Sequence, residues 1–138
     1  MEKTLILIKP DAVARGLNGE IIARFEKKGL KLRALKLIHL SDEMARRHYA
    51  VHTGKPFFDG LVEYMTSAPI VAMVFEGEKV IETARKIMGA TDPAKAEKGT
   101  IRADFGIDIG KNSVHGSDGI QTAETEIKLF FAGLEMFE

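Results

Sequence analysis

The longest apolar run of the chain spans residues 69–75 and reads PIVAMVF. A second run of this kind, TLILI, covers residues 4–8 and is closed by Pro10. Short apolar runs rich in β-branched residues and bounded by proline or glycine are typical of buried strands. We therefore expect a buried strand at each run, and a turn where Pro10 ends the first.

Apolar spacing predicts the remaining elements. Residues 30–40 alternate and then change phase at Leu35, which predicts a strand with a β-bulge. A short strand is expected near Val114. Helical spacing predicts five helices: one capped by Asn18 and stopped by Gly29, one capped by Ser41, one from Phe57, one at 80–88, and one from about Gly119 with a core stripe from Ile120 to Leu134. Residues 89–111 lose periodicity and predict a long irregular loop.

This order contains a β-α-β-β-α-β core. It predicts an α+β, ferredoxin-like βαββαβ sandwich with an antiparallel four-stranded sheet and added helices. A doubly wound parallel sheet is the alternative, and the lack of a helix after every strand weighs against it. The length of 138 residues predicts a single domain over residues 1–138.

Composition excludes several classes of protein. Lys plus Arg and Asp plus Glu both number 20, which excludes a broadly basic protein that coats nucleic acid. No cysteine is present, so disulfides, thiolate metal sites and cysteine nucleophiles are excluded. The longest apolar run is far shorter than the ~20 residues of a membrane span, and the N-terminus lacks the features of a signal peptide. A soluble, cytoplasmic protein is expected.

Two stretches of the sequence resemble known ligand-binding motifs but do not match them. Residues 106–112, GIDIGKN, resemble a P-loop, but the glycine spacing is one residue short and Asn112 stands where Ser or Thr binds magnesium. His48 and His52 are four residues apart on an expected helix, a spacing that can chelate a metal. No third ligand stands near them in the sequence, so we interpret them as a solvated helix face and expect no metal held by protein side chains. His39 is interpreted as a partly exposed strand residue.

His115 lies before the last expected helix, and Glu126 follows eleven residues later. A helix that starts at Gly119 turns Glu126 back toward the preceding loop. A carboxylate that holds one ring nitrogen of a histidine fixes its tautomer and leaves the other nitrogen free as a base or nucleophile. On this local pattern alone, a capped helix start with a half-buried histidine remains open. Three separated cations, Lys9, Arg85 and Arg102, are what a polyphosphate ligand requires, although each taken alone is typical of a surface residue.

Six motifs occur together in the chain. They are IKPD at residues 8–11, HY at 48–49, KPFF at 55–58, GATDP at 89–93, GTIRADF at 99–105 and NSVHGSD at 112–118. In this order and spacing the sequence resembles the nucleoside diphosphate kinases over essentially its whole length. The resemblance implies a ping-pong enzyme that moves the γ-phosphate of a nucleoside triphosphate to a nucleoside diphosphate with low base selectivity.

The resemblance also implies the roles of the site residues. His115 is expected to carry the phosphate, Glu126 and Ser117 to orient it, and Lys9 and Tyr49 to lie beside the transferring group. The remaining roles cover the bound nucleotide: Arg85, Thr91 and Arg102 for phosphates, Asn112 with Lys9 for the ribose, and Phe57 with Leu61 for the base. Mg²⁺ is expected to arrive on the nucleotide. The expected substrates are ATP, GDP and other ribo- and deoxyribonucleoside diphosphates.

The resemblance further implies a homohexamer, with a homotetramer as the alternative. The strand expected at residues 30–40 gives a physical reason for assembly, because an exposed edge strand can pair with a strand of another subunit. Residues 119–123 read GIQTA where the family usually has Ser-x-Glu-Ser-Ala, which weakens the helix start. The competing function is a non-catalytic, ferredoxin-like regulatory domain that binds nucleotides or RNA. Its RNA-binding form is disfavoured because the expected strands are aliphatic, and we expect no dedicated nucleic-acid site and no membrane partner.

Overall fold

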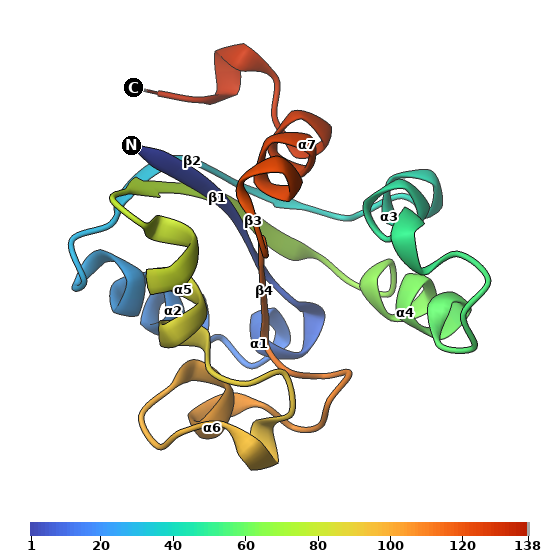
Figure 1. Cartoon of the computed structure of the whole chain (residues 1–138). Helices are drawn as coiled ribbons and strands as arrows, with labels where there is room; N and C mark the ends of the chain where they lie inside the picture. The colour runs from blue at the N-terminus through green and yellow to red at the C-terminus, as the bar shows by residue number, and fades with distance from the viewer. Residues whose placement is uncertain (138) are drawn as a thin grey trace.

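Four antiparallel strands form one sheet in the order β2-β3-β1-β4. The strands of this computed structural model, which describes residues 1–137, are β1 (Glu2–Ile8), β2 (Lys31–Ile38), β3 (Ile70–Gly77) and β4 (Val114–Gly116). The two apolar runs become β1 and β3, which pair with each other at the centre of the sheet (Figure 1). Both runs are apolar throughout because helices cover both faces of these central strands.

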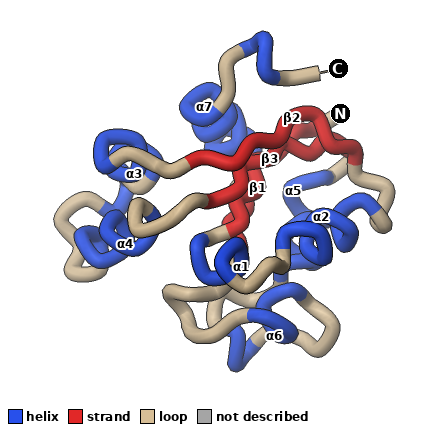
Figure 2. The backbone as a smooth tube through the Cα atoms, turned by 180° about the vertical axis from the view of Figure 1, so that it is seen from behind, coloured by secondary structure: helices blue, strands red, loops and turns tan. Residues whose placement is uncertain are grey.

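Successive residues of β1 pack into two hydrophobic cores, one on each face of the sheet. Ile6 and Ile8 pack with α2 (Asn18–Glu26) and α5 (Val80–Met88) on one face. Leu5 and Leu7 pack on the opposite face with α3 (Asp42–His48), α4 (Phe58–Met65) and α7 (Ile120–Phe130). This two-residue period follows from the pleat of a strand, and Figure 2 shows the arrangement from behind. The expected ferredoxin-like α+β sandwich is confirmed. No helix within residues 1–137 has the length and apolar character of a membrane span.

Several short helices and 3₁₀ turns were not expected, whereas the short strand expected near Val114 is present as β4. Pro10 begins the helix α1 (Pro10–Ala14) instead of a turn, because the fixed φ of proline suits the first position of a helix as well as the end of a strand. The expectation of an irregular segment at 89–111 is wrong in part. It contains the 3₁₀ turn η2 (Pro93–Lys95) and the helix α6 (Ile101–Phe105), which are capped by Asp92 and Thr100. Two further 3₁₀ turns are η1 (Ala50–His52) and η3 (Gly133–Glu135).

Two of the expected local features are confirmed. β2 contains the expected bulge, but the register against β3 shifts between Leu32 and Ala34, before the change of phase at Leu35. Ser41 caps α3, since its hydroxyl oxygen accepts a hydrogen bond of 3.1 Å from the amide of Met44. Asn18 was expected to cap α2, but it is the first helical residue and Leu17 occupies the capping position.

The last helix is shorter than its expected stripe. It ends at Phe130, and the chain bends before η3, so Leu134 is 95% exposed. Ile120 is also exposed. It is the first residue of α7, and the buried residues of this helix begin at Ala123. The expectation that both belong to the core is therefore wrong. Ala123, Ile127 and Phe130 are buried as expected.

Candidate active site

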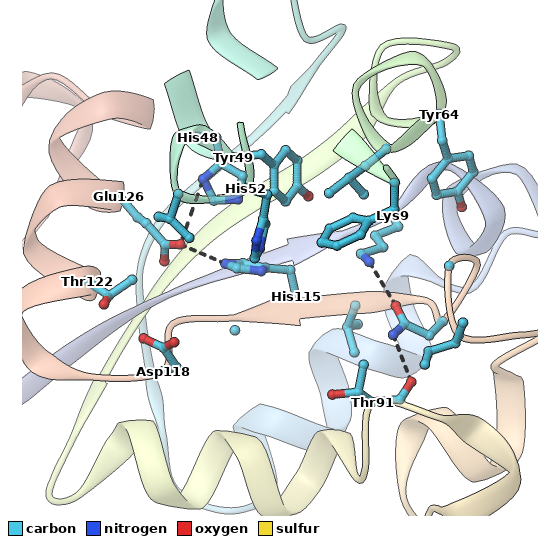
Figure 3. Close-up of a pocket in the computed structure, with 18 of the residues that line it drawn as sticks. Lys9, His48, Tyr49, His52, Tyr64, Thr91, His115, Asp118, Thr122 and Glu126 are labelled. Atoms are coloured by element: carbon cyan, nitrogen blue, oxygen red, sulfur yellow. Dashed lines mark hydrogen bonds and ion pairs between the residues drawn. The ribbon is translucent and has the colours of Figure 1, made fainter. Parts of the chain in front are cut away.

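A cleft of about 1230 Å³ lies where several segments far apart in the sequence meet. Its lining includes residues of α4, α5, α6, α7 and β4, together with the residue that follows β1. Every site residue expected from the sequence lines this cleft except Ser117, which lies directly behind Glu126. The fold therefore assembles the expected residues around a single cavity (Figure 3).

His115 occupies the middle of β4, opposite Leu7 of β1. Its Nε2 lies 3.0 Å from Oε2 of Glu126, within hydrogen-bond distance. The next residue in β4 is Gly116, and a larger residue would crowd α5 there. A Cβ on this glycine would stand 2.8 Å from Sδ of Met88. The imidazole is thus anchored at Nε2 on a strand that packs closely against α5, and Nδ1 remains for other chemistry.

A hydroxyl supports Glu126 from behind. The Ser117 hydroxyl donates a hydrogen bond of 2.5 Å to Oε1 of Glu126, and the amide of Leu5 donates to the same hydroxyl oxygen at 3.1 Å. Burial disfavours the charge on Glu126, but the hydrogen bonds from His115 and Ser117 outweigh it and hold the pKa of this carboxyl below its usual value. The carboxylate is therefore charged and fixed beside His115.

His48 lies in this site, contrary to the expectation of a solvated helix face. Its side chain is only 1% exposed, and its ring meets that of His115 edge-on with centroids 4.8 Å apart. Burial, together with the neighbouring His115, lowers the pKa of His48 to about 3. The Tyr49 ring also meets the His48 ring, and burial raises the pKa of the Tyr49 hydroxyl, which has no hydrogen-bond partner among the described residues. Both side chains are consequently neutral.

Lys9 brings a buried positive charge to the cleft. Its Nζ donates to Oδ1 of Asn112 at 2.9 Å, and the Asn112 amide donates in turn to the carbonyl of Thr91 at 2.9 Å. Burial and the nearby Arg102 lower the pKa of Lys9 to about 8, and Asp11 opposes this shift. The cleft thus holds a cation that an anionic ligand would stabilise.

Arg102 is buried on α6 and organises the surrounding loop. Its guanidinium donates to the carbonyls of Gly89, Asn112 and Val114 at 2.9, 3.3 and 2.8 Å. Burial and the neighbouring Arg85 lower the pKa of Arg102 to about 10, so this side chain is charged at neutral pH. A guanidinium has five N–H donors, and these bonds use three of them, so two have no hydrogen-bond partner among residues 1–137.

The apolar part of the lining comes from the segment around α4. Phe57 is 52% exposed, and its ring lies 5.1 Å from that of His52, while Leu61 follows one turn later. Exposed apolar side chains beside a cleft are suited to cover a flat ligand.

Two features of the site escaped the sequence analysis. One is Asp11, whose carboxylate accepts hydrogen bonds from the hydroxyls of Tyr64 and of Ser113. Ser113 has a φ of 74°, a conformation that costs about 1–3 kcal/mol and is held here by Asp11 and by the amide of Lys9. The other is His48, for which a signal existed: it lies three residues after the buried Ala45, on the same face of α3.

Comparison with known proteins agrees with this geometry. The model of the family described as nucleoside diphosphate kinase matches residues 2–136. Among curated relatives, nucleoside diphosphate kinases of Desulforamulus reducens and Synechococcus elongatus are 54% and 60% identical, over 100% and 99% of this chain and 93% and 91% of theirs. A halophilic nucleoside diphosphate kinase from Halobacterium salinarum, solved in complex with CDP, superposes with a TM-score of 0.97 at 48% identity, covering 99% of this chain and 91% of that one. The Aquifex aeolicus nucleoside diphosphate kinase gives 0.95 at 46% identity, covering 98% of each chain.

Proposed function

The chain belongs to the nucleoside diphosphate kinase family, whose members transfer the γ-phosphate of a nucleoside triphosphate to a nucleoside diphosphate, and we propose that it does so through a phosphohistidine on His115. One observation carries this proposal: Nε2 of His115 is held by a charged, buried Glu126 inside a cleft lined by cations. Family membership leaves the non-catalytic alternative without support.

In the first half-reaction, the lone pair on Nδ1 of His115 attacks the γ-phosphorus. The bond between this phosphorus and the bridging oxygen breaks, and its electron pair leaves with the nucleoside diphosphate. Positive charge develops on the imidazole during the attack, and Glu126 stabilises it through Nε2. In the second half-reaction a different diphosphate attacks the phosphohistidine, and the imidazole is regenerated. Tyr49 lies beside the transferring group in this proposal.

The other main contribution to catalysis is neutralisation of the negative charge on the phosphates, because phosphoryl transfer needs little covalent help from the protein. Lys9 is proposed to face the transferring phosphate, and Arg85, Thr91 and Arg102 the other phosphates. The two N–H donors of Arg102 that have no partner among the described residues support this role, because Arg102 lines the cleft. Mg²⁺ is proposed to enter as part of the nucleotide substrate, held by phosphate oxygens and water.

The nucleoside is proposed to lie along the apolar wall. Asn112 and Lys9, which already share a hydrogen bond of 2.9 Å, are suited to bind the ribose hydroxyls together. Phe57 and Leu61 would cover the base without reading its edge, which supports low selectivity among ATP, GDP and the other ribo- and deoxyribonucleotides. A cytoplasmic location is part of this proposal, because cells hold their nucleoside triphosphates there.

We further propose a homo-oligomer, with a homohexamer favoured over a homotetramer by the resemblance. Among the strands of residues 1–137, β2 pairs only with β3, and the exposed side chains of Leu35 and Leu37 lie on this outermost strand. The amide of Phe137 donates to the carbonyl of Arg33 near one end of the outer edge. An apolar outermost strand of this kind is a template for pairing with a second subunit.

The test is incubation with γ-labelled ATP and Mg²⁺, followed by addition of GDP or dCDP. The wild-type protein should take up label and release it onto the added diphosphate. The His115→Ala variant should do neither, while the His52→Ala variant, altered in a pocket residue outside the proposed chemistry, should still be labelled. Substantial labelling of His115→Ala would refute the proposal.

A further inference from the structure

Three potential metal ligands converge in the site from three different elements. His48 at the end of α3, His115 of β4 and Glu126 of α7 each offer one atom, and these atoms all lie within 4.8 Å of one another. Oε2 of Glu126 is 3.0 Å from Nε2 of His115 and 3.8 Å from Nδ1 of His48. Figure 3 shows the carboxylate beside both rings, with a dashed line to each.

The phosphotransfer mechanism leaves His48 without a role. Its side chain is almost completely buried, yet neither ring nitrogen has a hydrogen-bond partner among the described residues. A buried polar atom without a partner destabilises the folded protein, so a ligand that satisfies it is bound more tightly. The ring reaches toward Glu126, where an ion could bind (Figure 3).

We propose that His48, His115 and Glu126 form an inhibitory site for a borderline transition-metal ion of the Zn²⁺ class. Two imidazole nitrogens, one carboxylate oxygen and an open fourth position toward the cleft are a ligand set that Zn²⁺ accepts. Mg²⁺ prefers oxygen ligands, so the ion that accompanies the nucleotide does not compete for this site.

Binding requires the ligand atoms to close on the ion, and the largest movement is between the two imidazoles, because the three ligand atoms are spread over up to 4.8 Å. Ligand atoms around tetrahedral Zn²⁺ lie about 3.3 Å apart, given bonds of about 2.0 Å. The His115–Glu126 pair is already near this spacing at 3.0 Å, and the His48–Glu126 pair has to close by about half an ångström from 3.8 Å. The positive charges of Lys9, Arg85 and Arg102 in the same cleft oppose a cation, so we expect reversible binding.

Inhibition follows from the proton balance on His115. A metal at Nε2 takes the lone-pair position there, so the single proton of the neutral ring moves to Nδ1. That proton occupies the lone pair that attacks phosphorus in the proposed mechanism, and no proton is released. This inhibitory consequence rests on the proposed role of His115, whereas metal binding itself does not.

Binding is tested first on the wild-type protein, without nucleotide. The chain has four histidines, so ¹⁵N histidine spectra during a Zn²⁺ titration resolve which rings bind. We expect the resonances of His48 and His115 to move together at one equivalent, while the exposed His39 and the pocket residue His52 serve as internal controls. A titration to millimolar Zn²⁺ that leaves His48 and His115 unchanged, or moves only His39 and His52, would overturn the proposal.

The inhibitory role is tested by labelling of His115 with γ-labelled ATP at buffered free Zn²⁺, each protein being normalised to its own rate without zinc. His48→Gln should need at least about tenfold more free Zn²⁺ for half-inhibition than the wild type, and the matched control His52→Gln should not. Thermal unfolding shows whether His48→Gln is folded, and the wild-type spectra decide the matter if it is not. Equal zinc sensitivity in a folded His48→Gln overturns the site, whereas failure of wild-type labelling without zinc counts only against the proposed function.

Discussion

Raising the pH above about 8 should slow phosphoryl transfer, because Lys9 loses its charge there. The pKa of Lys9 falls from 10.5 to about 8, mainly through burial and secondarily through Arg102, with Asp11 opposing the shift. This depression corresponds to about 3 kcal/mol of unfavourable interaction with the charged form. Below pH 8 the ammonium is present, and above it the charge is lost. If only the charged form is competent, kcat/KM for MgATP should fall about tenfold between pH 7 and pH 9.

The assay is the rate of His115 labelling by γ-labelled ATP at subsaturating nucleotide, measured across this pH range. Bound phosphate stabilises the ammonium, so the fall in kcat should occur at higher pH than the fall in kcat/KM. Lys9→Arg keeps its charge throughout, and its lower rate should show no fall near pH 8. A wild-type profile that stays flat to pH 9.5, or a Lys9→Arg profile that keeps the fall, would contradict the role given to Lys9.

Four further predictions concern other parts of the molecule. Glu126→Gln should lower kcat by about 10- to 100-fold with little change in KM, since it removes a charge-assisted hydrogen bond; a rise in KM alone in steady-state kinetics would contradict this. Phe57→Ala should raise KM for every nucleotide while leaving kcat near the wild-type value. The wild-type efficiencies for ADP, GDP, CDP and UDP should stay within about a thousandfold of one another, and a wider spread would indicate a pocket that reads the base edge. Leu37→Lys should shift sedimentation velocity at micromolar protein toward smaller species, whereas a wild-type protein that sediments as a 15.2 kDa monomer would exclude the proposed oligomer.

The main strands were predictable from the sequence because their signal is local. The runs at residues 4–8 and 69–75 are apolar on both faces, and the change of phase at Leu35 indicated a bulge in β2 that lies between Leu32 and Ala34. The helix α1 was missed because it has only five residues, too few to show a period. The end of α7 was misjudged because Phe131 is buried although it is no longer helical, so the apolar pattern continued past Phe130.

The expected site residues came from the resemblance that the six motifs carry, and the structure brings all of them except Ser117 to the lining of one cleft. The sequence did not indicate that Arg102 holds backbone carbonyls together. Its three acceptors lie in two segments, at residue 89 and at residues 112–114, which meet only in the folded chain. The partner of Asp11, Tyr64, lies 53 residues away and has no local signal. His48 was assigned to solvent because the helix pattern shows which side is buried but not that His115 and Glu126 lie there.

The central claim is that Glu126 holds Nε2 of His115 and thereby leaves Nδ1 as the nucleophile. It is tested most directly by labelling the protein with ATP, isolating the phosphoprotein at alkaline pH and using ³¹P and ¹⁵N spectra to find the nitrogen that carries the phosphate. We predict one phosphate on Nδ1 of His115, with Nε2 still protonated and bonded to the carboxylate. A phosphate on Nε2, or on a residue other than His115, would contradict this account.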